Sequence, residues 1–158
     1  MLAERRTAPA PIDSSAGNAT EIQSAKTMRE EDAPFHAHVY YLPETRAVAV
    51  TLRDSLLRSM QGGAASGILY VGQLRDHKVG PHPIPQFEVH FLCSDHDKIV
   101  PILEASGLTI LVHPLTQDDL ADHTTLGRWI GEPIPLDMTT LDPPGVNQGV
   151  ARFGKTDF

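Results

Sequence analysis

Several features that define common protein classes are missing from the sequence. A single cysteine in 158 residues excludes a disulfide framework and any zinc site built from several thiolates. No segment approaches the ~18 consecutive apolar residues of a membrane helix, and the N-terminus lacks the apolar core of a secretory signal. The 13 lysines and arginines are outnumbered by 20 acidic residues, which argues against a nucleic-acid partner. We therefore expect a cytoplasmic protein with no membrane or nucleic-acid partner.

Common catalytic motifs are also absent. The sequence has no phosphate-binding glycine loop, dinucleotide fingerprint, His-Glu-x-x-His helix or Gly-x-Ser-x-Gly turn. What it has in excess is histidine, with eight residues. Because histidine is the commonest metal ligand and acid/base side chain, this surplus is the first functional signal.

Composition divides the chain into three parts. Residues 1–33 contain no aromatic residue and few large aliphatic ones, so we predict a disordered tail. Residues 34–141 carry the patterns of a folded domain. Residues 142–158 are predicted to form an irregular C-terminal tail.

The residue patterns within the domain predict four strands and two helices. The strands are expected at residues 35–41, 67–73, 87–93 and 108–113. One helix is expected between Pro43 and Gly62, where apolar residues recur at four-residue spacing, and another between Ser94 and Gly107. The order predicts an α+β, ferredoxin-like βαββαβ fold with a four-stranded antiparallel sheet, both helices on one face, and a C-terminal extension. The other face is then open to bind a ligand or to dimerise.

The predicted strands place several histidines on that open face. His36 and His38 alternate with apolar residues that belong under the helices. The same alternation puts Glu88 and His90 on the open face of the third strand, and His113 on that of the fourth. Because the first strand lies between the third and fourth in this fold, these side chains should converge. His82 comes from a loop with three prolines, which limit its freedom.

Imidazoles and a carboxylate without thiolates suit non-haem iron, zinc, copper or nickel. Two histidines and one carboxylate with open positions form the site of many iron(II) oxygenases. Other interpretations stay open for single residues, since an isolated strand histidine is more often solvated or hydrogen-bonded. His77 and His96 lie in polar surroundings typical of a surface, and His90 suits a ligand, a substrate contact or an interface.

Several motifs together resemble the small DOPA 4,5-dioxygenase family. They are Phe-His-Ala-His-Val-Tyr-Tyr at 35–41, Val-Gly-Pro-His-Pro at 79–83, Phe-Glu-Val at 87–89, Val-His-Pro at 112–114, Asp-Leu-Ala-Asp-His at 119–123 and Trp-Ile-Gly-Glu-Pro at 129–133. The resemblance covers about residues 34–141. It implies a ferredoxin-like fold, a homodimer, and iron(II)-dependent extradiol cleavage of a catechol such as L-DOPA by O2, with another divalent metal such as zinc also able to occupy the purified protein.

The resemblance also implies roles for individual residues. The motif histidines correspond to His36, His38, His82, His113 and His123. We expect metal ligands among His38, His82 and His113, with His36 or Glu88 as a candidate further ligand, and proton transfer by His123 or His36.

Three further residues are expected to contact the substrate. Arg128 is predicted to pair with an amino-acid carboxylate, and Tyr40 and Glu88 are predicted to line the substrate site. The alternative outside catalysis is a ferredoxin-like dimeric protein that binds a metal or a small ligand without turnover.

Overall fold

The computed structural model describes residues 29–63 and 66–157. Most of the predicted N-terminal tail, residues 1–28, therefore lies outside the described residues. The described end of that segment is joined to the domain. Glu30–Asp32 form a short 3-10 helix, and the carbonyl of Ala33 accepts a hydrogen bond from the backbone N–H of Cys93 (2.8 Å).

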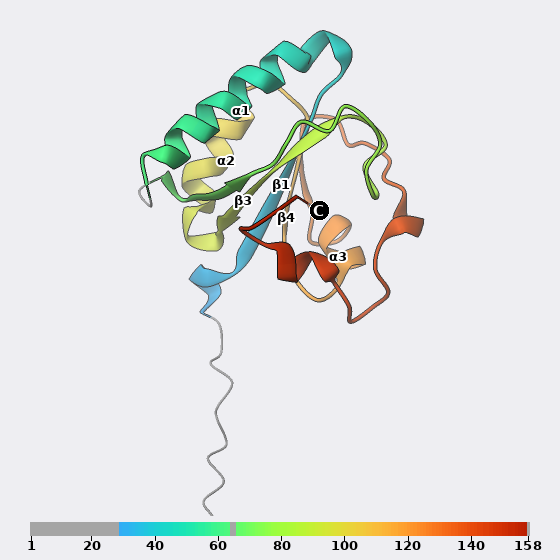
Figure 1. Cartoon of the computed structure of the whole chain (residues 1–158). Helices are drawn as coiled ribbons and strands as arrows, with labels where there is room; N and C mark the ends of the chain where they lie inside the picture. Colours follow the sequence, from blue (N-terminus) through green and yellow to red (C-terminus); the bar gives the residue numbers. More distant parts are fainter. Residues whose placement is uncertain (1–28, 64–65, 158) are drawn as a thin grey trace, which may run out of the picture.

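A five-stranded antiparallel sheet forms the centre of the domain (Figure 1). Its strands are β1 (Pro34–Tyr40), β2 (Ile68–Val71), β3 (Gln86–Leu92), β4 (Ile110–Pro114) and β5 (Arg128–Ile130), in the spatial order β2-β3-β1-β4-β5. The first strand lies between the third and fourth, as predicted. The predicted number of strands was wrong, because β5 has only three residues and is defined by its pairing with β4.

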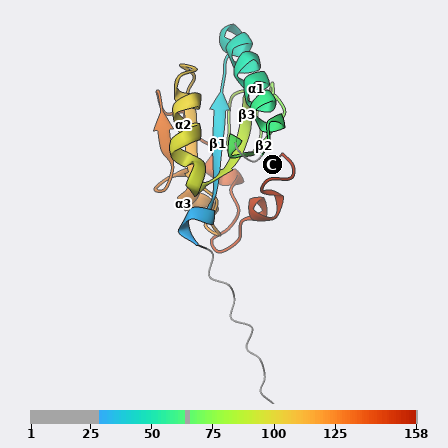
Figure 2. The same ribbon diagram turned by 90° about the vertical axis from the view of Figure 1, so that its left-hand side faces the viewer.

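Two helices cover one face of this sheet (Figure 2). Helix α1 (Arg46–Gln61) connects β1 to β2, and α2 (His96–Glu104) connects β3 to β4. A third, one-turn helix, α3 (Asp119–His123), follows β4. No helix in the described part of the chain is long and apolar enough to cross a bilayer.

The helix-covered face of the sheet holds the hydrophobic core. Leu52 and Leu56 of α1 and Ile99 and Leu103 of α2 are buried against it. The core residues of the three central strands are Ala37, Val39, Phe87, Val89, Phe91, Ile110 and Val112. Full burial of such an aliphatic or aromatic side chain contributes about 1.5–3 kcal/mol, so this face supplies most of the stability.

The C-terminal segment, residues 142–157, lies on the opposite face (Figure 1, red). Its only regular element is a 3-10 helix, Gln148–Arg152. The ring of Phe153 stacks on those of His90 and His36, with centroids 5.5 and 6.0 Å apart, and the backbone N–H of Gly154 donates to Nδ1 of His90 (2.9 Å). The face predicted to be open is therefore partly covered by the chain's own C-terminal segment.

Candidate metal centre

Six histidines are buried together on the sheet face opposite the helices. They are His36 and His38 from β1, His90 from β3, His113 from β4, His82 from the loop before β3, and His123 from α3. None of the six is more than 8% exposed. The strand register accounts for their proximity, since His36 lies directly across from His90 on one side and from His113 on the other. The convergence predicted from strand alternation is confirmed.

His38 and His113 approach most closely through their Nε2 atoms, which are 3.1 Å apart. Nδ1 of His113 donates to the carbonyl of Pro114 (2.7 Å), and Nδ1 of His38 faces Oε1 of Gln86 (3.4 Å). If each ring carries its proton on Nδ1, the lone pairs on Nε2 of His38 and of His113 face each other. Their mutual repulsion is relieved when a cation lies between them. Two nitrogens bound at about 2.1 Å and at a right angle around one ion would be about 3.0 Å apart. The observed pair fits a shared metal ion.

His82 and His123 are oriented in the same way. The Tyr40 hydroxyl is 2.7 Å from Nδ1 of His82, and Nδ1 of His123 donates to the backbone carbonyl of Asp119 (2.9 Å). The Asp119 carboxylate is 3.2 Å from the same nitrogen of His123. Metal-binding histidines are commonly held by such a partner on the second ring nitrogen, which fixes the tautomer and leaves the other nitrogen for the ion.

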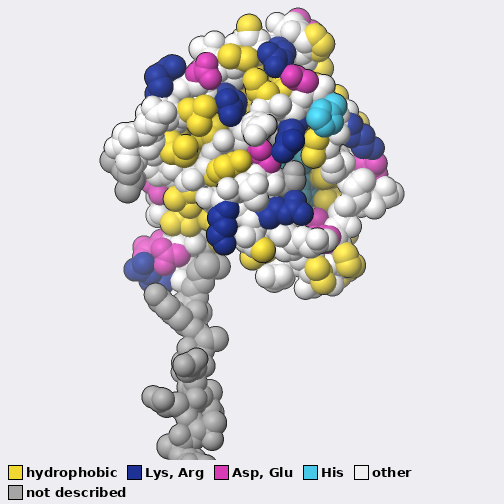
Figure 3. Space-filling model, in the orientation of Figure 1, with side chains coloured by type: hydrophobic (Ala, Val, Ile, Leu, Met, Phe, Trp, Pro, Cys, Tyr) yellow, Lys and Arg dark blue, Asp and Glu magenta, His cyan; other side chains and the backbone are white. Residues whose placement is uncertain are grey.

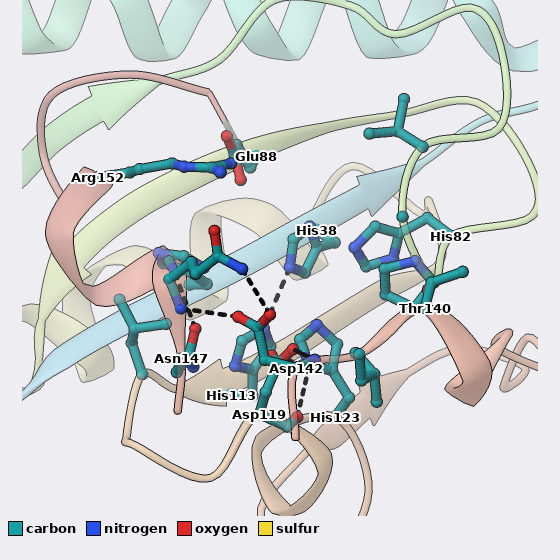
Figure 4. A pocket seen from close by; sticks show the side chains of 18 of the residues that line it. His38, His82, Glu88, His113, Asp119, His123, Thr140, Asp142, Asn147 and Arg152 are labelled. Carbon is teal, nitrogen blue, oxygen red and sulfur yellow. Dashed lines mark hydrogen bonds and ion pairs between the residues drawn. The ribbon is translucent and has the colours of Figure 1, made fainter. Parts of the chain in front are cut away.

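The potential ligand atoms form two groups that share one residue. Nitrogen atoms of His36, His38 and His113 lie within 4.8 Å of one another, and so do those of His38, His82 and His123. The predicted ligands His38, His82 and His113 are thus divided between the two groups (Figure 4). His38 is the common member and the central candidate ligand.

A third group, made of His36, Glu88 and His90, fits a metal less well. Nδ1 of His90 accepts a hydrogen bond from Gly154, so a neutral ring carries its proton on Nε2. That Nε2 lies 3.6 Å from the Glu88 carboxylate. A metal needs a lone pair on the ligating nitrogen, and this tautomer presents a proton toward Glu88 instead. His90 is therefore a weaker candidate ligand than the other buried histidines.

Four of these histidines are held in the neutral form that metals require. Burial lowers the pKa of His36, His38, His82 and His113 well below the usual value, and repulsion from neighbouring imidazoles lowers it further. Neutral imidazole is the form that binds metals, so an ion would not have to displace protons from these rings near pH 7.

Five of the six histidines, all but His90, line a cavity of about 260 Å³. Its wall includes Glu88 of β3, Asp119 of α3, the loop at 79–82, and residues of the C-terminal segment. Figure 3 shows histidine surface at the bottom of a recess on this side of the molecule. The volume suits a small molecule, and the wall offers both carboxylates and apolar groups.

The expected substrate contacts lie in different places. Glu88 lines the cavity. The Tyr40 ring stacks on Trp129 (centroids 5.6 Å apart) behind His82, so its hydroxyl positions a histidine. Arg128 is exposed, and its partner across β4 is Val112, whose side chain belongs to the core under the helices. Arg128 therefore lies on the helix side of the sheet, and the arginine that lines the cavity is Arg152.

Sequence reasoning missed the residues that the C-terminal segment brings to the site. Asn147 donates from Nδ2 to the carbonyl of Thr116 (2.8 Å) and to the Asp122 carboxylate (3.2 Å). Asp122 also accepts from the backbone N–H and the hydroxyl of Thr116 (2.8 and 2.7 Å). This buried cluster fastens the C-terminal segment beside α3. Its members are scattered in sequence and carry no recognisable spacing.

Comparison with known proteins places these observations in a family. Residues 35–140 match the Dopa 4,5-dioxygenase family. The chain is 32% identical over 127 residues to DOPA 4,5-dioxygenase of Amanita muscaria, covering 77% of this chain and 54% of that protein. It is 28% identical over 117 residues to an uncharacterised 21.2 kDa protein of Botryotinia fuckeliana, covering 68% of this chain and 62% of that one.

A solved structure agrees with this assignment. The crystal structure of a candidate dioxygenase from Nostoc punctiforme superposes with a TM-score of 0.57 and 37% identity, over 70% of this chain and 91% of that one. The chain spans just over half to about three-fifths of the length of the two curated relatives. All six buried histidines lie within the matched range, whereas the C-terminal segment lies beyond it. The resemblance seen in the motifs is confirmed, and the chain belongs to the Dopa 4,5-dioxygenase family.

Proposed function

We propose that the protein is a non-haem iron(II) dioxygenase that opens the ring of a catechol such as L-DOPA in extradiol fashion with O2. The observation that carries the proposal is the pair of Nε2 atoms of His38 and His113, 3.1 Å apart, above one cavity. Family membership supports an oxygenase, and the donor set suits iron because it consists of nitrogen and oxygen alone.

His38, His82 and His113 are the proposed ligands, with the other members of the two histidine groups as neighbours. A bound Fe(II) ion would supply the redox chemistry with O2 and the chelation of two adjacent catechol oxygens, which no side chain provides. Zn²⁺ fits the same donors and is the expected contaminant of protein purified in air. Gln86, Tyr40 and the Pro114 carbonyl keep the ligand rings in orientation.

Proton transfer from the catechol is assigned to His123, with His36 as the second candidate. Nδ1 of His123 lies 3.2 Å from the Asp119 carboxylate. When the ring takes a proton on Nε2, this carboxylate stabilises the resulting imidazolium. Burial lowers the pKa of His36 well below its usual value, and its ring packs among those of His38, His90 and His113, so the carboxylate contact favours His123 over it.

The test is anaerobic reconstitution with Fe(II), followed by L-DOPA and air. We expect about one iron per chain, oxygen uptake, and a yellow ring-opened product. His38→Ala and His113→Ala should each lose metal, whereas His77→Ala, at an exposed turn, should behave as wild type. Full metal occupancy in both site variants would contradict the assigned centre. Iron binding without consumption of any catechol would favour the non-catalytic alternative, a protein that binds a metal or small ligand.

Three broader expectations accompany this proposal. The order β2-β3-β1-β4, with α1 and α2 on one face, supports a ferredoxin-like core extended by β5. A homodimer remains a prediction that sedimentation equilibrium of the full chain would check. A cytoplasmic location likewise stays a prediction, and it is consistent with a family whose proposed reaction needs a readily oxidised ferrous ion.

A further inference from the structure

The cavity wall has one permanently positive side chain. Among its described lining residues, Arg152 is the only lysine or arginine, while Glu88, Asp119 and Asp142 are acidic. An anionic group on a ligand would be repelled by these carboxylates unless it lay beside Arg152. The position of Arg152 therefore decides whether, and in which orientation, an acidic ligand is accepted.

Two of the three carboxylates are directed toward donors of the protein itself. The Asp142 carboxylate accepts hydrogen bonds from the backbone N–H and the side-chain amide of Gln148 (2.7 and 2.9 Å). Asp119 accepts from the backbone N–H of Asp142 (2.9 Å) and adjoins His123. The third, Glu88, lines the same cavity, and the Arg152 side chain points toward it in Figure 4. The guanidinium is thus directed to the Glu88 side of the cavity.

The backbone around Arg152 is anchored on both sides. Phe153 and Gly154 are held against His90 by ring stacking and by the 2.9 Å hydrogen bond. Upstream, Asn147 is tied to Thr116 and Asp122. A guanidinium held in place loses less entropy when it binds a carboxylate, and the planar fork of arginine matches both oxygens at once.

We propose that Arg152 binds the carboxylate of the substrate, so that the site selects catechols that carry an acidic side chain. The inference rests on the proposed function and adds a determinant of substrate class. The diol would face His38 and His113, while the side chain would extend toward Arg152 and Glu88, on the far side of His38 from His82 (Figure 4). Because Arg152 lies beyond residues 35–140, this selectivity is carried by a segment outside the family match.

Four catechols that share the ring but differ in the charge of the side chain separate binding of the charge from binding of the ring. L-DOPA carries a carboxylate and an ammonium, 3-(3,4-dihydroxyphenyl)propionate only a carboxylate, dopamine only an ammonium, and 4-ethylcatechol neither. Binding to the Fe(II)-loaded full chain would be measured by anaerobic calorimetry, without turnover. For Arg152→Ala we expect the affinity for the two carboxylates to fall roughly 10- to 100-fold, the loss typical of a charge-assisted pair. The affinity for the other two should change less than 3-fold.

Matched variants complete the experiment. Arg152→Lys should recover part of the carboxylate affinity, since it keeps the charge and loses the fork. Arg58→Ala, at an exposed position of α1, should match wild type. Metal content and thermal unfolding of each variant verify that the site is intact.

Four results would overturn the inference. An equal loss for all four catechols in Arg152→Ala would mean that the residue only shapes the cavity. Loss of carboxylate preference in Arg128→Ala, but not in Arg152→Ala, would assign the role to the other arginine. If wild type consumes catechols without preferring carboxylates, this inference alone fails. If wild type binds no catechol at all, the proposed function fails and the inference with it.

Discussion

The two faces of the central sheet use the same strands for opposite purposes. On β1, Ala37 and Val39 pack under the helices, while His36 and His38 point into the cavity. Both sets are buried, but only the first gains free energy from leaving water without further conditions. The second needs a hydrogen-bond partner for each ring nitrogen, or a metal. Stability and chemistry are therefore separated here by residue alternation rather than by distance.

The largest loss of stability should follow from a substitution in the core on the helix-covered face. Phe87 is fully buried in the core, so Phe87→Ala should lower the free energy of unfolding by about 3–5 kcal/mol. Urea denaturation of the metal-free protein measures this. Leu126→Ala, at a leucine that is 49% exposed, is the control and should change stability by less than about 0.5 kcal/mol. The protein that remains folded should still bind metal in full. A loss below 1 kcal/mol would contradict the assignment of this face as the core.

The next largest effect is the stabilisation of the folded state by a metal ion bound on the cavity face. At a free Fe(II) concentration 100 times Kd, binding should stabilise the folded state by about 2.7 kcal/mol, which raises Tm by roughly 5–10 °C. His38→Ala should abolish this increase because His38 belongs to both histidine groups. Anaerobic thermal unfolding with and without Fe(II) is the measurement, with His77→Ala as the control. An unchanged metal-dependent rise in Tm would remove His38 from the centre.

The helix-covered face was predictable because the apolar residues that form it recur at regular intervals in the sequence. Apolar residues at alternate positions of β1 and β3, and at four-residue spacing in α1, determine the order of the elements and their buried sides. Strand β5 escaped detection because three residues are too few to establish a period, and only the pairing with β4 defines it. Its register also explains why Arg128 lies away from the cavity.

The cavity face was predictable only in part. Alternation places His36, His38, His90 and His113 on one side, and the family motifs add His82 and His123. The division of ligands between two groups depends on side-chain rotation and on partners such as Gln86 and Tyr40, which no local pattern encodes. Arg152 and Asn147 were missed because an irregular segment without periodicity brings them from far along the chain.

Adjacent tyrosines allow a smaller and sharper test of the two faces. Tyr40→Phe keeps the ring on Trp129 and removes the hydroxyl 2.7 Å from Nδ1 of His82. We expect metal affinity to fall roughly 10- to 100-fold, the usual cost of losing such a partner. Tyr41→Phe is the matched control. Its hydroxyl donates to Asp76 (2.9 Å), so this change should leave metal affinity as it is. Competition with a chelator measures both, and equal losses would contradict the separation of the faces.

The smallest effect concerns acid stability at the helix-side end of β1. The carboxylate of Asp76 accepts hydrogen bonds from Nε and Nη2 of Arg46 (both 2.8 Å) and from Tyr41, which lowers its pKa to about 2. Because the unfolded-state pKa is near 3.9, the stabilisation is complete above about pH 4 and is lost as the pH falls toward 2. Wild type should therefore lose stability across this interval relative to Asp76→Asn, and the two should converge at the acidic end.

Chemical denaturation between pH 5 and pH 2 would record the difference. Because the Arg46–Asp76 pair is exposed, 1 M salt should reduce the stability difference between wild type and Asp76→Asn. Parallel stability curves for wild type and Asp76→Asn would show that the pair contributes nothing to acid stability. Metal affinity of the Asp76→Asn variant at neutral pH should equal that of wild type, since Asp76 is hydrogen-bonded to Arg46 and to Tyr41, whose ring belongs to the core on the opposite face of the sheet from the six buried histidines. A change in metal affinity would instead mean that the two faces are coupled through the backbone between Tyr40 and Tyr41.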